Sequence, residues 1–346
     1  MKMKTLLLSA SIACTAVAAQ AETLNLMAYS GIFEQYYRKA VVEPFMAQNP
    51  DITVEYFGMP NSAQMLGTLR SQVADPQFDV AIMDITVSKA GTDDGVFAPL
   101  DESVTTHIKD LVPLARLEGT NAVGVTLDSM TMIYNKDLVV APPTSWEDLW
   151  NPAYEGKIVL AAAPDTTGLI FTVVADRMAG GTDYKTSTEK GIEKVMTLAP
   201  SVQTWEPHPD VYQPVMTGSA IIGLGWNARA QILAGGEGSK LAVVMPKEGS
   251  GFQINAIGLI ENAQNTDAAK RFIDYALSPE TQAALANAMF YAPTNANAAA
   301  LISKEALGKT VLSTTDSMLD LDWNVMAQIR EGVAKEWRRR VIPLTR

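Results

Sequence analysis

The 346-residue sequence contains one cysteine and two histidines, and a long apolar run occurs only within its first 21 residues. The cysteine, Cys14, lies in that leader, so the chain after it has no thiol for a disulfide or a cysteine metal site. The histidines, His107 and His208, are far apart in unrelated loops, where a solvated or boundary histidine is the usual case. We therefore expect no metal site and no histidine-assisted catalysis.

Several sequence motifs of enzymes and nucleotide-binding proteins are also missing. The chain has no H-E-x-x-H, no G-x-S-x-G and no P-loop. A formal G-x-G-x-x-A pattern runs from Gly223 to Ala228. It contains the bulky Trp226 where a pyrophosphate would have to approach, so we assign no dinucleotide site to it and expect no cofactor.

The chain has few basic residues. It carries 27 Lys and Arg against 38 Asp and Glu, a net charge of -11. An acidic surface argues against nucleic acid as the main partner. The one basic cluster, residues 338–340, suits the C-terminal end of a helix, where cations complement the helix dipole.

The first 21 residues have the pattern of a secretory signal. Two lysines precede a short apolar run over residues 6–17, and Ala19-Gln20-Ala21 fits an A-x-A cleavage site. We expect a signal peptide over residues 1–21, a mature chain from Glu22 and a periplasmic location. A lipid anchor on Cys14 is the alternative.

Strands and helices are expected to alternate in the first part of the chain. Strands are predicted over residues 23–29, 52–57 and 78–84, with helices over 34–48 and 65–73. This order implies parallel strands with right-handed crossovers. Tyr29, Ser30 and Asp84 then fall together at the carboxyl ends of strands, where open α/β sheets bind ligands.

The middle of the chain repeats this alternation and is expected to form a second lobe. A strand over residues 126–137 is a predicted crossing, and a strand over 157–163 leads into a helix that opens with Thr166, Thr167 and Gly168. Such a helix start offers free backbone N–H groups. The predicted domains are lobe 1, residues 22–125 plus 258–346, and lobe 2, residues 126–257.

A set of polar and aromatic residues is predicted to line a cleft between these lobes. Trp226 could stack on a ligand, whereas Asp84, Asp128 and Asp165 could accept from ammonium groups. Arg229 could bind a carboxylate with its planar fork of donors. The predicted ligand-binding residues are Tyr29, Ser30, Gly31, Asp84, Asp128, Thr166, Thr167, Gly168, Trp226, Asn227, Arg229, Gln253 and Asn255.

Four segments in a fixed order carry a resemblance to a known family: TSWEDLWNPAYEGKIVL, GLGWNA, VVMPKEGSGFQINAIGLIENAQN and YAPTNANA. On these segments the chain resembles bacterial ABC-transporter solute-binding proteins, specifically the spermidine/putrescine-binding branch. The resemblance implies an α/β, type II periplasmic binding protein fold with two lobes, each a mostly parallel sheet flanked by helices. Hinge closure over a solute and delivery to a membrane permease follow from it. It also implies ligand roles for Trp226, for Asp84 and for the loop of Tyr29, Ser30 and Gly31.

Some positions depart from the pattern of that branch. Asn255 stands where the branch has a carboxylate that grips an amine, and Gln253 replaces an aromatic residue. Thr166-Thr167-Gly168 replaces an acidic residue and suits an oxyanion better than an ammonium. The departures favour a ligand with an anionic end, such as a zwitterion, a carboxylate or a phosphonate.

We therefore expect a monomeric receptor for a small polar solute that does not convert its ligand. Two alternatives stay open. A secreted hydrolase would use two of the aspartates, at about 5–10 Å from each other. A ferric-ion receptor of the same fold would need a cluster of oxygen ligands, for which Tyr36 and Tyr37 are candidates.

Overall fold

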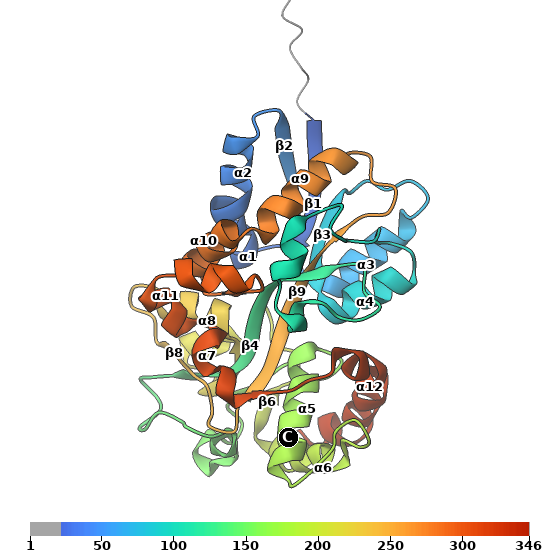
Figure 1. Ribbon diagram of the computed structural model, residues 1–346. Helices are drawn as coiled ribbons and strands as arrows, with labels where there is room; N and C mark the ends of the chain where they lie inside the picture. The colour runs from blue at the N-terminus through green and yellow to red at the C-terminus, as the bar shows by residue number, and fades with distance from the viewer. Residues whose placement is uncertain (1–21, 346) are drawn as a thin grey trace, which may run out of the picture.

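The structure is a computed structural model that describes residues 22–345. The expected signal peptide, residues 1–21, lies outside the described residues. Two hydrophobic cores organise the rest, one above the other in Figure 1, and strands β4 and β9 connect them. The mixed α/β fold agrees with the prediction, and its helices flank the sheet in both lobes. No helix among the described residues is long and apolar enough to cross a bilayer.

The β-α-β-α-β unit predicted from the sequence builds the first core. Strand β1 lies between β2 and β3 and pairs with both in parallel. All residues of β3 are buried, and β1 is buried at Leu24 and from Leu26 to Ala28. Strand β2 alternates buried and exposed residues as an edge strand does. The elements are β1 (Glu22–Tyr29), α1 (Ile32–Tyr37), α2 (Glu43–Gln48), β2 (Ile52–Met59), α3 (Ser62–Ser71), β3 (Val80–Asp84) and α4 (Ile85–Asp93).

The second core is built from shorter strands. Strand β5 pairs in parallel with β6 and β7, while α5, whose middle is buried on all sides, packs against α6. The elements are β5 (Ile158–Val159), α5 (Thr166–Met178), α6 (Glu189–Leu198), β6 (Val202–Thr204), α7 (Tyr212–Thr217), β7 (Ile222–Trp226), α8 (Asn227–Ala234) and β8 (Leu241–Val244).

Two long antiparallel strands run through both lobes. All thirteen residues of β4 (Val123–Asn135) are buried. Its first half pairs with β9 (Ser250–Leu259), and its second half pairs with β7 and β8. Strand β9 also pairs in an antiparallel direction with β3 of the first lobe. The expected lobe boundaries, after residues 125 and 257, fall inside these two strands and stay a prediction.

The segment after β9 first returns to the first lobe. Helices α9 and α10 carry Phe272 and Met289 into the first core. From Val311 onward, the buried side chains belong to the second core. The elements are α9 (Thr266–Leu277), α10 (Pro279–Met289), β10 (Ala292–Pro293), α11 (Lys304–Lys309), β11 (Met318–Leu319) and α12 (Trp323–Glu336).

This packing of the C-terminal segment differs from the prediction, which placed all of residues 258–346 in the first lobe. Fully buried Trp337 donates from Nε1 to Thr172 Oγ1 of α5 at 2.9 Å and meets Trp205 edge-on at 5.2 Å. In Figure 1, α12 lies beside α5 and α6 in the lower lobe. The apolar face of this helix decides where it docks, and the sequence pattern does not show which core that face meets.

Candidate functional site

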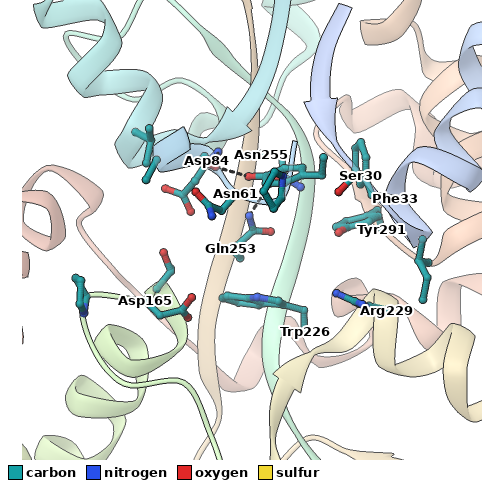
Figure 2. Close-up of a pocket in the computed structure, with 18 of the residues that line it drawn as sticks. Ser30, Phe33, Asn61, Asp84, Asp165, Trp226, Arg229, Gln253, Asn255 and Tyr291 are labelled. Carbon is teal, nitrogen blue, oxygen red and sulfur yellow. Dashed lines mark hydrogen bonds between the residues drawn. The ribbon is translucent and has the colours of Figure 1, made fainter. Parts of the chain in front are cut away.

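A cavity of about 550 Å³ lies between the lobes, a size typical of sites for small organic ligands. It opens at the carboxyl ends of β1, β2 and β3 on one side and at the starts of α5 and α8 on the other (Figure 2). Its wall is formed by Tyr29, Ser30, Ile32, Phe33, Pro60, Asn61, Ser62, Ala63, Asp84, Val87, Pro164, Asp165, Thr166, Trp226, Arg229, Gln253, Asn255, Met289, Tyr291 and Arg330.

Hydrogen bonds hold the first-lobe rim together. The Tyr29 hydroxyl lies 2.7 Å from Ser62 Oγ, and the backbone N–H of Asp84 donates to the same Ser62 Oγ at 3.0 Å. The ends of three strands are thereby fixed to one another. The three strands are parallel neighbours, so their carboxyl ends lie at the same edge of the sheet, where these hydrogen bonds connect them.

Two aspartates of the wall begin helices. Asp84 is the N-cap of α4, where its Oδ1 accepts from Thr86 N at 2.9 Å and Thr86 Oγ1 at 2.6 Å. Asp165 is the N-cap of α5, where its Oδ1 accepts from Thr167 N at 2.8 Å. Burial raises the pKa of Asp84, while the hydrogen bonds from Thr86 and the positive charge of Arg330 oppose that rise. Both carboxylates keep Oδ2 without a donor among residues 22–345.

Trp226 and Arg229 form the opposite wall. Trp226 ends β7 opposite Met130 of β4, and its backbone N–H donates to the Tyr212 hydroxyl at 2.8 Å. Arg229, on the first turn of α8, donates from Nη2 to Asp210 Oδ2 at 2.8 Å and lies 5.0 Å above the Tyr212 ring. Asp210 and Tyr212 therefore fix the direction of the guanidinium. Its other N–H donors remain available for a ligand.

Amides form the back of the cavity. Gln253 donates from Nε2 to Asn255 Oδ1 at 2.6 Å, and Asn255 donates from Nδ2 to Thr126 Oγ1 at 2.9 Å. Asn255 pairs with Asp84 across β9 and β3. This chain of bonds places an uncharged, ordered surface at the point where both lobes meet.

An aromatic group closes the cavity beside Ser30. The ring of Phe33 meets Tyr29 at 5.5 Å and Tyr291 at 5.7 Å, both edge-on. Burial raises the pKa of the Tyr29 and Tyr291 hydroxyls, with nearby aspartates adding to the effect. Both phenols therefore stay protonated near neutral pH and can donate a hydrogen bond.

Eight of the thirteen predicted residues lie on this wall, and they come from both lobes. Whether each of them touches the ligand stays a prediction. The eight are Tyr29, Ser30, Asp84, Thr166, Trp226, Arg229, Gln253 and Asn255.

The other predicted residues around the helix starts have structural roles outside the wall. Gly31 is exposed and turns the chain after β1 with a φ of 74°. Thr167 is buried and gives its N–H to Asp165. A Cβ on Gly168 would lie 2.2 Å from the backbone nitrogen of Ala163, so this glycine permits close packing. Of the predicted oxyanion site, only Thr166 lies on the wall, and oxyanion binding there stays a prediction.

Asp128 and Asn227 also lie off the wall, in the crossing region. Both carboxylate oxygens of Asp128 accept from Ala228 N, at 3.0 and 3.2 Å, which caps the start of α8. Burial raises the Asp128 pKa to about 7. Asn227 donates from Nδ2 to Lys309 O at 2.8 Å. The hydrogen bonds of Asp128 and Asn227 therefore fix the backbone between Trp226 and Arg229 on the side away from the cavity.

Several wall residues were missing from the predicted set. Asn61 and Ser62 could have been found, because they follow the second strand on the rim that Tyr29 and Asp84 share. Tyr291 lies in a segment that carried the family resemblance. Arg330 had no signal, since only the docking of α12 brings it to the cavity.

The family model for bacterial extracellular solute-binding proteins matches residues 40–310. The chain belongs to this family. That confirms the resemblance seen in the sequence, and it assigns the chain the role of a receptor for a small polar solute. Members of the family are binding proteins of transport systems rather than enzymes.

The relatives of this solute-binding protein are named for different ligands. The spermidine/putrescine-binding periplasmic protein of Escherichia coli is 23% identical over 353 residues, covering 97% of each chain. The gamma-aminobutyric acid-binding protein of Pseudomonas aeruginosa is 26% identical over 297 residues, covering 84% of this chain and 82% of the relative. The crystal structure of an ABC transporter substrate-binding protein from Bradyrhizobium japonicum superposes with a TM-score of 0.80 at 19% identity, covering 92% and 99% of the chains.

The residues named for the two alternative functions are placed as follows. Asp84 and Asp165 share the cavity, but each is engaged as a helix cap. Tyr37, named for a ferric site, is fully buried in the first core and is not part of the wall. Among residues 22–345, no three His, Cys, Asp or Glu side chains cluster as a metal site would require.

Proposed function

We propose that this solute-binding protein captures a small zwitterion with an ammonium at one end and a carboxylate at the other, as in an ω-amino acid. The observation that carries the proposal is the distribution of charge in the cavity. Asp84 and Asp165 lie on one side in Figure 2, Arg229 and Tyr291 lie on the other, and Trp226 spans the space between them.

The acidic side suits an ammonium group. Asp84 and Asp165 each use one carboxylate oxygen to cap a helix and keep the other without a donor among the described residues. An ammonium has three donors and no acceptor, so two free carboxylate oxygens match it well. Its charge would also favour the ionised form of Asp84, whose pKa is raised by burial.

The opposite side suits a carboxylate. The Arg229 guanidinium has five donors, of which Asp210 uses one, and its Nε is buried without a partner among residues 22–345. Tyr291 adds a neutral hydroxyl, and Ser30 adds a second one. Asn255, in place of a carboxylate, removes one anion from the back wall and favours the same ligand class.

The middle of the cavity suits a short methylene chain. The Trp226 indole offers an apolar face, and its backbone is fixed on both sides by Tyr212, which accepts from Trp226 N and donates to Trp226 O at 3.2 Å. The named ligand of the P. aeruginosa relative, gamma-aminobutyric acid, has this amine–methylene–carboxylate form. The polyamines named for the E. coli relative have amines alone.

The transport role completes the proposal. The chain is exported through its N-terminal signal and acts in the periplasm as a monomer. It closes over the zwitterion by a hinge movement and delivers it unchanged to an ABC-transporter permease. Support comes from the periplasmic relatives of E. coli and P. aeruginosa and from the site between two lobes.

Calorimetric titration with four-carbon ligands tests the ligand class. We expect 4-aminobutyrate to bind at least about tenfold more tightly than putrescine or succinate, which match it in length and differ in charge. The variant Arg229→Ala should weaken 4-aminobutyrate more than putrescine, because it removes a donor to the carboxylate. Tighter binding of the diamine or of the diacid would contradict the proposal.

A further inference from the structure

Arg330 enters the cavity from an unexpected direction. It lies on α12, four residues after Met326 and four before Ala334, which are both buried. Residues four apart share a helix face, so Arg330 stands on the side of α12 that packs against the protein. It is half-buried and lines the cavity.

Arg330 differs from the other charged residues of the wall in having no partner. Asp84 and Asp165 cap helices, and Arg229 pairs with Asp210. Among residues 22–345, Arg330 makes no hydrogen bond and no ion pair. A guanidinium that lines a cavity without a hydrogen-bonded or ion-paired partner acts on its surroundings through its unpaired charge.

The position of α12 brings this charge to the acidic side. Helix α12 packs against both α4 and α5, the two helices that Asp84 and Asp165 begin. The Arg330 charge acts on Asp84, where it opposes the rise in the Asp84 pKa caused mainly by burial. Because Arg330 and Asp84 line the same cavity, the Arg330 charge also acts on a cation bound beside Asp84.

The charged residues of the wall balance to zero. Two carboxylates, Asp84 and Asp165, face two guanidiniums, Arg229 and Arg330. Asp210, which pairs with Arg229, is not part of the wall and adds a negative charge behind it. Without Arg330 the cavity would be acidic and would attract dications, whereas with it the cavity matches a ligand of zero net charge.

We propose that Arg330 is a specificity-determining residue that makes the cavity reject diamines and polyamines. This inference rests on the proposed zwitterion site and names the element that sets its charge selectivity. Arg330 repels the ammonium beside Asp84 in either ligand, but at the far end it attracts the carboxylate of a zwitterion, which offsets part of that repulsion. In a diamine both charges are repelled, so specificity arises from a repulsive element against the competing ligand.

The test compares three variants by calorimetry with putrescine and 4-aminobutyrate. Arg330→Gln should tighten putrescine binding by about tenfold or more and change 4-aminobutyrate binding by less than about threefold. Arg330→Lys keeps the charge and should keep the wild-type discrimination. Arg338→Gln removes a cation from an exposed site beyond α12 and should leave both affinities unchanged.

The outcomes for Arg330 and for the proposed function can be told apart. Unchanged putrescine affinity in Arg330→Gln, or an equal change for both ligands, would overturn the inference. Should Arg330→Gln not fold, as judged by circular dichroism, Arg330→Met retains most of the stem and gives the same comparison. Failure of the wild type to bind 4-aminobutyrate would sink the proposed function, while the gain for the diamine would still report on Arg330.

Discussion

At the scale of single residues, the site combines side chains fixed by the protein with donors and acceptors left free. Trp226 is tied by its backbone to Tyr212 and paired across to Met130, so its ring is presented to the cavity in a set position. Arg229 is oriented by Asp210. A binding site with its groups already in place loses less entropy when the ligand arrives.

Replacement of Trp226 by Ala should weaken ligand binding by roughly 2 kcal/mol or more, as expected for a central aromatic anchor. Trp226→Phe, which keeps an aromatic face, should recover most of that loss. Calorimetry with 4-aminobutyrate measures both variants. Wild-type affinity in Trp226→Ala would mean that the ligand lies elsewhere.

Asp128 should make the stability of the protein depend on pH. Its pKa is raised from 3.8 to about 7 by burial, so the folded state binds the proton more tightly than the unfolded state. Its stabilising contribution is present below the unfolded pKa and is lost as the pH rises through the folded pKa. The buried phenols of Tyr212 and Tyr291 interact with the same charge.

The variant Asp128→Asn does not titrate at this position. Between about pH 5 and pH 8, its unfolding free energy should therefore rise relative to wild type by about 3 kcal/mol, at about 1.4 kcal/mol for each pKa unit. Urea unfolding of both proteins across this range measures the difference. A difference that stays flat, or that falls with pH, would show that Asp128 is not a buried titrating group.

At the scale of elements, strand ends and helix starts supply the wall. Strands β1, β2 and β3 end at the first-lobe rim, where α4 starts with the Asp84 cap. Helix α5 starts with the Asp165 cap on the second-lobe side of the cavity. Helix α12 contributes Arg330 because it lies against both α4 and α5. The C-terminal helix is thus part of the site as well as part of the second core.

Loss of the Trp337 side chain should loosen this helix. Trp337 is fully buried, donates to Thr172 and packs on Trp205, so Trp337→Ala should lower the free energy of unfolding by about 3–5 kcal/mol. Trp337→Phe should cost less, since it keeps most of the packing. Chemical denaturation checks both, and a loss under about 1 kcal/mol in the alanine variant would contradict the docking of α12.

The elements also show how far sequence reasoning reached. Alternating apolar residues marked β1 and β2, and a nearly continuous apolar run marked β3. The strand-end rule put Tyr29, Ser30 and Asp84 on one rim, where the structure has them. The rule could not show whether a polar residue faces the cavity or caps a helix from behind. Asp128 caps α8 through Ala228 N, a residue 100 positions away that only the tertiary fold brings to it. Thr167 is buried and gives its backbone N–H to the Asp165 cap.

The remaining misses have a tertiary cause. The pairing of Arg229 with Asp210 joins residues 19 positions apart, and no local pattern reports it. Arg330 reaches the cavity only because α12 docks on the second lobe. The family resemblance supplied the two-lobe fold and the receptor role. It does not name the ligand, and the departures at Gln253 and Asn255 are the reason that we propose a zwitterion in place of a polyamine.

At the scale of the whole molecule, β4 and β9 pass between two separate cores, so closure over the ligand would bend these strands. We expect a saturating ligand to reduce the radius of gyration in small-angle X-ray scattering, as in hinge closure of binding proteins. Trp226→Ala at the same ligand concentration serves as the control. An unchanged radius in the ligand-saturated wild type would contradict closure.

The orientation of the ligand tests the central claim most directly. A crystal structure of the complex with 4-aminobutyrate should place the ammonium within hydrogen-bond distance of Asp84 and Asp165 and the carboxylate beside Arg229 and Tyr291. The methylenes should lie on the Trp226 ring. A ligand bound in the reverse direction, or outside the cavity, would contradict the account.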